Sequence, residues 1–332
     1  MKSAGIIGLG KYLPKKVVTN NDLVLMGLDT TDEWIKDRSG IEERRISDAS
    51  ESSSDLAYEA GKNAIADAGL KPEDIDLLIV ATTTPDYQVF PSTAAILQAR
   101  LGLRQVGAFD LSAACTGFSY ALTTATQFVK TGFAKNVLVI GVDTLSKYVN
   151  WQDRSICILF GDGAGAAVVS EVKYDYGVLS SNLYADGKHA ETLIVRAGGS
   201  RTPISEELLR QQQNYIYMNG KAVFKLAVNC VVPSILDALE KTNLTPSDLD
   251  FFVPHQANIR IIEAARERLG LKPEQVYVNL QKYGNTSSAS IPIALTEAKE
   301  EKLLKDGQIL ALSGFGAGFT WATNIIRWGG LL

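Results

Sequence analysis

The segments DAGLKPEDIDLLIVATT (67–83) and KTNLTPSDLDFFVPHQA (241–257) repeat one pattern: a helix end, a proline-containing turn and an apolar strand. Pro72 in the first segment corresponds to Pro246 in the second, 174 residues later. Helix–strand units look alike in many α/β proteins, so a single pair of this kind is explained either by chance similarity or by duplication.

A second pair of segments favours duplication. NVLVIGVDT (136–144) and QILALSGFG (308–316) are apolar strands that end in a glycine or aspartate turn, and they lie 172 residues apart. Nearly constant spacing is typical of a repeated unit. We therefore predict two similar α/β halves, residues 1–172 and 173–332. Their matching strands are expected to end at facing loops, where ligands bind in such sheets.

Short β-branched runs alternate with longer amphipathic segments along the chain, which indicates α/β architecture. Strands are predicted over residues 4–10, 76–82, 106–112, 136–142, 155–160, 165–172, 249–255 and 308–314. Helices are predicted over residues 53–68, 92–101, 116–131, 221–241, 258–269 and 291–304, and Ser53 or Ser54 is expected to cap the first. Residues 184–216 show no regular period and are predicted to form a long excursion.

The composition is that of a globular protein, with 46% hydrophobic and 21% charged residues. A net charge of −4 argues against a nucleic-acid-binding protein. The apolar runs are about strand length, which predicts no membrane span. Three cysteines without disulfide or metal-ligand spacing, and no signal-peptide pattern, favour a reducing, cytoplasmic setting.

Cys115, in AFDLSAACTGFSYAL (108–122), differs from the other two cysteines. Cys157 and Cys230 lie in apolar strand and helix patterns and are predicted to be packing residues. Cys115 instead follows a predicted strand and precedes a predicted helix, whose unpaired N–H groups stabilise a thiolate. It is either a reactive thiol or a small packed side chain, and the small residues around it favour the reactive interpretation.

The chain has two histidines. His189 lies in a polar segment and is predicted to be a surface side chain. His255 ends an apolar strand of the second half, at the place where the first half has Thr82 or Thr83. A lone histidine is usually structural, but the carboxyl end of a strand is where such sheets bind ligands, and this favours a catalytic His255.

Two segments of the second half carry groups suited to a site. YGNTSSAS (283–290) predicts a tight turn before a helix, where the amide of Asn285 either faces a site or belongs to a helix start. SGFGAGFTWA (313–322) either brings backbone N–H groups to an oxyanion or is an ordinary turn. GLGKYL (8–13) and FGDGAGAAVV (160–169) do not fit nucleotide-binding loops, and no zinc or calcium ligand spacing is present.

Cys115, HQAN (255–258) and YGNTSSAS (283–290) together resemble the β-ketoacyl-acyl-carrier-protein synthase III family of the thiolase superfamily. The resemblance extends over essentially the whole chain through TTDEWIKDRSGIEERR (30–45), FPSTAA (90–95), FGDGAGA (160–166) and GFGAGFTW (314–321). It implies a five-layer α/β/α/β/α thiolase fold made of two similar halves, usually assembled as a homodimer.

The resemblance implies an initiating condensation of fatty acid synthesis with Cys115, His255 and Asn285 as catalytic residues. Cys115 takes an acyl group from acyl-CoA as a thioester. His255 and Asn285 then hydrogen-bond the thioester oxygen of malonyl-acyl carrier protein, and the carbanion formed as CO2 leaves attacks acyl-Cys115. The oxyanion hole consists of the N–H groups of Cys115 and of Gly316 or Ala317. At the position of Ala317, relatives often have glycine. No metal or redox cofactor is implied.

The same resemblance implies the substrate contacts. Trp34 and Arg154 clasp the adenine of CoA, because an indole face and a guanidinium suit a base. The full CoA set is Thr30, Trp34, Arg38, Arg154, Gly220 and Asn258. Phe90 crosses a dimer interface to close the acyl pocket. Arg260 and Arg268 dock the acidic carrier protein, although Glu263 and Glu267 dilute this basic patch.

Other functions fit the motifs less well. A biosynthetic thiolase requires a second cysteine in the C-terminal glycine loop, and an elongating synthase requires a histidine where this chain has Asn285. The main alternative is a specialised relative of secondary metabolism that transfers its acyl group to another acceptor. A nucleotide-dependent oxidoreductase, tested by an absorbance change with NAD(P)H, and a non-catalytic acyl-binding protein remain further alternatives.

Overall fold

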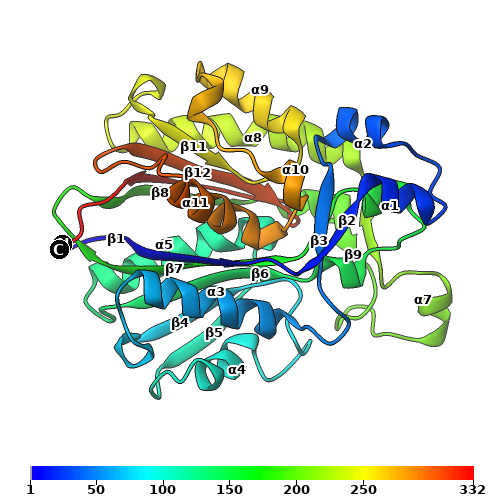
Figure 1. Cartoon of the computed structure of the whole chain (residues 1–332), viewed down its shortest axis with the longest axis horizontal. Coiled ribbons are helices and arrows are strands. Elements are labelled where there is room, and N and C mark those ends of the chain that lie inside the picture. The colour runs from blue at the N-terminus through cyan, green and yellow to red at the C-terminus, as the bar shows by residue number, and fades with distance from the viewer. Residues whose placement is uncertain (1) are drawn as a thin grey trace.

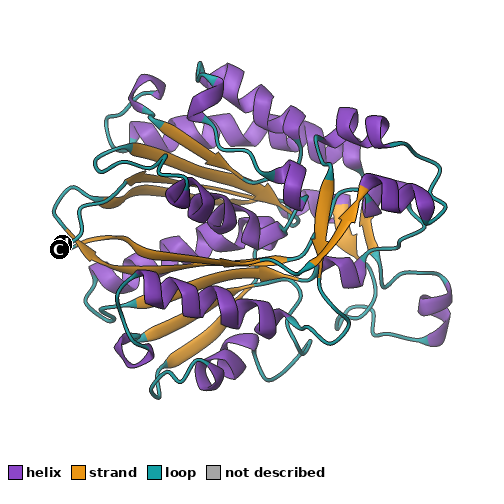
Figure 2. Cartoon of the chain, viewed as in Figure 1, coloured by secondary structure: helices purple, strands orange, loops and turns teal. Residues whose placement is uncertain are grey.

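The computed structural model describes residues 2–332, which form two main β-sheets and three layers of helices in the order α/β/α/β/α (Figures 1 and 2). Each sheet is covered by helices on both faces, so the strands at the centre of the first sheet are buried along their whole length. The predicted five-layer α/β fold class is confirmed.

The first sheet has the strand order β1-β7-β6-β4-β5. Its strands are β1 (Ser3–Tyr12), β4 (Leu77–Ala81), β5 (Gly107–Leu111), β6 (Val137–Asp143) and β7 (Gly163–Val172). β4 pairs in parallel with β5 and β6, whereas β7 runs antiparallel to both β6 and β1. β5 therefore forms an open edge of this sheet.

The second sheet repeats this topology in the order β11-β12-β13-β8. Its strands are β8 (Gly177–Ala185), β11 (Phe251–Pro254), β12 (Ile309–Gly316) and β13 (Thr320–Arg327). β11 is parallel to β12, and β13 is antiparallel to both β12 and β8. The two sheets can be matched strand by strand, with β11, β12, β13 and β8 corresponding to β4, β6, β7 and β1. The strand order and the parallel or antiparallel pairing of neighbours are then the same in both sheets, which supports the proposed halves 1–172 and 173–332.

The helices occupy an outer, a central and a second outer layer (Figure 1). The first outer layer contains α3 (Ser53–Asp67) and α4 (Thr93–Arg100). The central layer contains α5 (Gly117–Lys130) and α11 (Ser290–Glu300), and the second outer layer contains α8 (Gly220–Glu240) and α9 (Ile259–Leu269). The largest apolar core joins the two sheets through the central pair, with Phe118 of α5 and Leu295 of α11 both fully buried. The central layer thus holds the two halves together.

α8 departs from the prediction that apolar runs are no longer than a strand. Its 21 residues are long and apolar enough to cross a membrane, with a mean hydropathy of 1.7 over an 18-residue window. In this fold 44% of that window is buried, and α8 packs on β12, β13 and α9. A helix buried in a layered core has the same composition as a membrane span.

Two local predictions are wrong. Residues 155–160 form no strand, and the first three of them belong to α6 (Arg154–Cys157), at whose start the Asp153 carboxylate accepts from the Ser155 N–H at 2.9 Å. α3 is capped by Ser52, which forms a capping box with Asp55, so the two serines expected to cap it lie inside the helix. A run of apolar residues this short fits a strand or a buried helical turn equally well.

Several short elements were not predicted. They are β2 (Lys16–Thr19), α1 (Asn20–Leu25), α2 (Asp32–Ser39), β3 (Glu43–Ile46) and α10 (Leu280–Tyr283), in addition to β8 and β13. The predicted excursion is largely irregular, and it contains β9 (Leu193–Val195) and α7 (Glu206–Arg210), with β9 pairing with β10 (Ile216–Met218). α1, α2 and β9 lie together at the right of Figure 1, beyond the ends of the two sheets.

Candidate active site

A cavity of about 670 Å³ receives residues from both halves of the chain. Cys115, His255 and Asn285 all line it, together with Gly316. Each of these residues lies at or just beyond the end of a strand or short helix, as the repeat predicts for facing loops. The fold therefore brings the three residues expected to be catalytic into one pocket.

Cys115 lies in a tight turn of residues 114–116 between β5 and α5. Ala114 in this turn has a φ of 49°, in the left-handed region that an alanine rarely adopts. The Cys115 side chain is 7% exposed and faces the pocket. Strained backbone beside a buried thiol is the kind of local structure that functional turns contain.

The protonation state of Cys115 differs from the sequence prediction. Burial raises the pKa of the thiol to about 12; a hydrogen bond with the Ser287 hydroxyl opposes this effect, and the charge of Asp143 reinforces it. The sequence led us to expect a stabilised thiolate, whereas the direction of this shift favours the thiol. Desolvation, the largest cause, disfavours the charged form.

This pKa predicts how Cys115 reacts with an alkylating reagent. Modification by iodoacetamide is expected to accelerate about tenfold for each pH unit between about pH 7 and 9, because the thiolate fraction rises toward a pKa of about 12. Peptide mapping by mass spectrometry measures the rate at Cys115 separately from Cys157 and Cys230. A rate that stops rising below pH 9 would contradict the raised pKa.

His255 follows β11 directly, as predicted, and is 3% exposed. Its Nδ1 lies 2.6 Å from the Ser290 Oγ, and its ring packs edge-on against Phe315 with the ring centroids 5.4 Å apart. Burial lowers the pKa of His255 to about 3. The imidazole is therefore neutral near pH 7 and offers the pocket a hydrogen bond rather than a charge.

Asn285 is held in place by backbone bonds to the first half. Its N–H donates to the Leu159 carbonyl at 2.8 Å, and its own carbonyl accepts from the Gly161 N–H at 3.0 Å. The Ser287 N–H donates to the Asn285 Oδ1 at 2.9 Å. Because the side-chain oxygen is occupied, the Nδ2 amide group is the donor left for a ligand.

One buried carboxylate joins this turn to the first half. Asp143, at the end of β6, accepts from the Ser288 hydroxyl at 2.8 Å and from its N–H at 3.2 Å. It also accepts from the N–H groups of Thr83 at 2.7 Å and Thr84 at 3.1 Å. Sequence reasoning missed this role, although an aspartate ending a wholly apolar strand was a usable signal.

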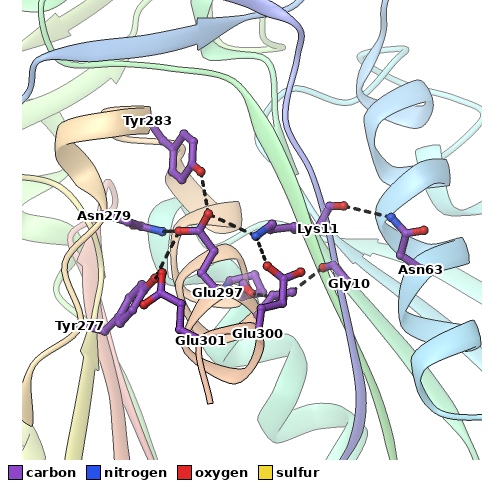
Figure 3. A network of polar contacts seen from close by, with 11 residues as sticks. Gly10, Lys11, Asn63, Tyr277, Asn279, Tyr283, Glu297, Glu300 and Glu301 are labelled. Carbon is purple, nitrogen blue, oxygen red and sulfur yellow. Dashed lines mark hydrogen bonds and ion pairs between the residues drawn. The ribbon is translucent and has the colours of Figure 1, made fainter. Parts of the chain in front are cut away.

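A second buried network fixes the helix that follows the Asn285 turn (Figure 3). Glu297 of α11 accepts from the Tyr283 hydroxyl at 2.6 Å, from Asn279 at 2.8 Å and from Lys11 at 3.2 Å. Burial alone would raise the pKa of Glu297, but these hydrogen bonds and the Lys11 charge hold it below its usual range. The turn is therefore anchored both at Tyr283 before it and at α11 after it.

The predicted oxyanion-hole residues lie beside Cys115. Gly316 ends β12, and a Cβ added there would lie 2.7 Å from the Cys115 nitrogen, so only glycine allows this approach. Ala317 follows in the turn to β13 and does not line the pocket. The close approach of the two backbones supports an oxyanion site between them.

Four of the six residues expected to bind CoA line the same pocket. They are Trp34, Arg38, Gly220 and Asn258. Arg154 and Thr30 do not, but the Arg154 guanidinium lies 5.2 Å and that of Arg38 5.6 Å from the Trp34 ring centroid. The buried Thr30 hydroxyl has no hydrogen-bond partner among residues 2–332. Both guanidinium groups thus lie within cation–π distance of the indole, and the predicted clasp of an adenine by Trp34 and Arg154 stays a prediction.

The two arginines predicted to dock the carrier protein differ in position, and Phe90 lies away from the pocket. Arg260 lines the pocket and pairs with Asp37 at 2.8 Å, whereas Arg268 lies outside the pocket lining and donates to the Val228 carbonyl. Phe90 is 80% exposed and does not reach the Cys115 pocket of its own chain. This placement is compatible with a Phe90 that acts on a second subunit.

Sequence reasoning missed most of the apolar lining. Phe160, Leu193, Met218, Phe224, Ile261 and Phe315 line the pocket and come from six separate segments. No local pattern marks them, because an apolar residue facing a cavity and one facing the core have the same periodicity. Among residues 2–332, no group of three or more His, Cys, Asp or Glu side chains is arranged to hold a metal ion.

Comparison with known proteins gives a consistent result. Residues 109–187 match the family model of 3-oxoacyl-[acyl-carrier-protein (ACP)] synthase III, and residues 239–328 match the model of its C-terminal region. The β-ketoacyl-[acyl-carrier-protein] synthase III of Caldanaerobacter subterraneus subsp. tengcongensis is 56% identical over 326 residues, or 98% of each chain. That of Symbiobacterium thermophilum is 52% identical over 329 residues, or 99% of each chain.

A solved structure shows the same likeness. The crystal structure of 3-oxoacyl-[acyl-carrier-protein] synthase III from Aquifex aeolicus VF5 superposes with a TM-score of 0.90 at 46% sequence identity. The match covers 98% of this chain and 100% of that one. Sequence and structure therefore agree over nearly the full length.

Proposed function

Because this chain belongs to the β-ketoacyl-[acyl-carrier-protein] synthase III family, and so is a condensing acyltransferase that initiates fatty acid synthesis, we propose that Cys115, His255 and Asn285 are its catalytic residues. One observation carries this proposal. The three side chains line a single buried pocket, although the second and third lie 140 and 170 residues beyond the first. Chance placement of all three at one point is improbable in a chain of 332 residues.

In the first step the sulfur of Cys115 attacks the thioester carbonyl of acyl-CoA. A bond forms between the sulfur and the acyl carbon, the bond to the CoA sulfur breaks, and the thiol proton leaves with CoA. The N–H of Cys115 and that of Gly316 or Ala317 stabilise the oxyanion that develops.

In the second step malonyl-acyl carrier protein occupies the emptied pocket. His255 and the Asn285 amide donate hydrogen bonds to its thioester oxygen, where negative charge collects as CO2 leaves. The resulting carbanion attacks the acyl-Cys115 carbonyl, the carbon–sulfur bond breaks, and 3-oxoacyl-acyl carrier protein is released. The Cys115 thiolate that leaves takes up a proton from solvent, which restores the thiol. Loss of CO2 makes the condensation effectively irreversible. This chemistry needs no metal or redox cofactor, so activity is expected to survive treatment with EDTA.

The acyl donor and the cell compartment are part of the same proposal. An acyl-CoA donor is supported by Trp34, which lines the pocket and whose indole lies within cation–π distance of the guanidinium groups of Arg38 and Arg154. All three cysteines are free thiols, which suits a reducing, cytoplasmic location.

Intact-protein mass spectrometry after incubation with acetyl-CoA tests this function most directly. The expected result is a mass increase of one acetyl group that is absent from Cys115→Ser. No increase, or an increase that persists in the variant, would exclude the covalent step at Cys115. A panel of malonyl-carrier protein, malonyl-CoA and other acceptors then distinguishes the initiating enzyme from a specialised relative with another acceptor.

Arg260 is proposed to contact the acidic carrier protein at the pocket mouth, with Arg268 further along α9. Arg260→Glu is expected to raise the KM for malonyl-carrier protein about three- to tenfold with a smaller effect on kcat, because a rim charge mainly affects encounter. Arg210→Glu, on the exposed α7, is the control and should leave the KM unchanged. An equal KM for Arg260→Glu and the unmodified enzyme would remove Arg260 from the docking surface.

A homodimer is proposed from the exposed edge of the first sheet. β5 lacks a neighbour on one side, and a cavity of about 640 Å³ beside it is lined by Phe109 and by the exposed loop residues Tyr87 and Val89. Phe90, at the tip of this loop, is in position to reach a second copy, since it reaches nothing of its own pocket. Unpaired strand edges and apolar loops are typically covered by a partner.

The dimer is tested by sedimentation. The unmodified protein is expected to sediment as a dimer, and Val89→Asp/Phe90→Asp to shift toward the monomer, since two charges would be buried at the interface. Phe133→Asp is the matched control, because Phe133 is also exposed, at 73%, but lies outside this loop. A monomeric unmodified protein at micromolar concentration would contradict the proposal.

A further inference from the structure

His255 has a hydroxyl rather than a carboxylate behind its ring. Its Nδ1 lies 2.6 Å from the Ser290 Oγ, and no carboxylate within residues 2–332 forms an ion pair with it. Ser290 is the first residue of α11 and is 2% exposed, so water does not compete for this contact. Nδ1 is therefore engaged inside the protein, and Nε2 is the nitrogen left for a ligand in the pocket.

The hydrogen bonds of Ser290 determine which partner holds the proton. A hydroxyl donates one hydrogen bond and accepts up to two. The Gln256 N–H already donates to the Ser290 Oγ at 3.4 Å, and within residues 2–332 the His255 Nδ1 is the one acceptor in reach of the hydroxyl proton. If Nδ1 carried a proton instead, the buried hydroxyl proton would have no acceptor, which costs about 1–3 kcal/mol.

We propose that Ser290 is a positioning residue whose hydroxyl donates to Nδ1 of His255 and so fixes the imidazole as the neutral Nε2–H tautomer. This proposal rests on the proposed catalytic role of His255. In this tautomer His255 donates from Nε2–H to the thioester oxygen. The Asn285 amide donates to the same oxygen, because its own side-chain oxygen already accepts from the Ser287 N–H. Burial, which lowers the pKa of His255, supports a ring that never becomes imidazolium near neutral pH.

A hydroxyl suits this task better than a carboxylate. An aspartate behind Nδ1 would hold the proton there and favour an imidazolium, whose Nε2 alternates between donor and acceptor. A serine imposes the opposite tautomer and adds no charge. The thioester oxygen then meets two donors, His255 Nε2–H and Asn285 Nδ2–H, in every turnover.

Nitrogen NMR observes the tautomer directly, because protonated and unprotonated imidazole nitrogens have well separated shifts. The chain has only two histidines, so His189→Gln, a surface substitution outside the pocket, leaves His255 as the sole signal. In this otherwise unmodified protein we expect a protonated Nε2 and an unprotonated Nδ1. A protonated Nδ1 would overturn the proposal, and this measurement does not depend on any change at Ser290.

Kinetics of Ser290 variants provide the second readout. In Ser290→Ala we expect the tautomer signals to mix or reverse, and decarboxylation of malonyl-carrier protein to fall about 10- to 100-fold, the usual effect of removing such a supporting partner. Acylation of Cys115 is expected to fall much less. Ser290→Thr, which keeps the hydroxyl, should restore both the Nε2–H signal and most of the rate.

Ser119→Ala is the matched control, since Ser119 is a fully buried serine whose hydroxyl has no hydrogen-bond partner within residues 2–332. It should change neither the signals nor the rates. An unchanged tautomer and decarboxylation rate in Ser290→Ala would refute the proposal while leaving the role of His255 intact. Failure of the proposed function itself has a different signature, namely normal turnover in Cys115→Ala or His255→Ala.

Discussion

Cys115→Ala is expected to lose acyl transfer from acyl-CoA by at least about 10³-fold, the scale on which removal of a nucleophile acts. The same variant should still decarboxylate malonyl-carrier protein, because His255 and Asn285, the residues proposed to stabilise the developing enolate, are unchanged. Their supports lie on Ser290 and Ser287, and neither contact passes through the sulfur of Cys115. Mass spectrometry measures the acyl-enzyme, and release of labelled CO2 measures decarboxylation.

His255→Ala is the converse variant and should separate the same two steps in the opposite direction. Acylation of Cys115 is expected to persist, while decarboxylation falls by about 10²- to 10³-fold, as when one oxyanion donor is removed. Asn285→Ala should behave similarly. If Cys115→Ala and His255→Ala lost acylation and decarboxylation to the same extent, the proposal that Cys115 serves the first step and His255 the second would be wrong.

Asp143→Ala is expected to have the largest effect on stability. The Asp143 carboxylate is fully buried and accepts hydrogen bonds from Thr82, Thr83, Thr84 and Ser288, including three backbone N–H groups. Alanine would leave these donors buried without an acceptor, at about 1–3 kcal/mol each before relaxation. We expect the free energy of unfolding to fall by about 3–5 kcal/mol, as when one side of a buried charged network is removed.

Chemical denaturation monitored by tryptophan fluorescence measures this change. Glu274→Ala is the control, because Glu274 is an exposed carboxylate without a hydrogen-bonded side-chain partner among residues 2–332 and should alter stability by less than about 0.5 kcal/mol. Asp143→Ala should also slow decarboxylation, since Ser288 lies in the turn that carries Asn285. An unchanged free energy of unfolding in Asp143→Ala would show that the hydrogen bonds of Asp143 do not stabilise the contact between the two halves.

The sequence predicted the architecture well because the decisive signals are local. Apolar runs of strand length and amphipathic runs of helix length indicated most strands and helices, and the repeat at 67–83 and 241–257 indicated equivalent halves. β4 and β11 lie in those repeated segments, and their sheets have matching order and direction. The strand predicted at 155–160 failed for the same reason, because a short apolar run fits more than one local structure.

The sequence by itself indicated the residues that we propose as catalytic: a thiol at Cys115, an imidazole at His255 and an amide at Asn285, each in a segment that links two elements. Only the tertiary structure decided their state. The raised pKa of Cys115 and the lowered pKa of His255 come from burial, and the donor roles that we propose for His255 and Asn285 rest on their contacts with Ser290 and Ser287. Desolvation and hydrogen-bond direction depend on neighbours contributed by distant segments, so no local pattern encodes them.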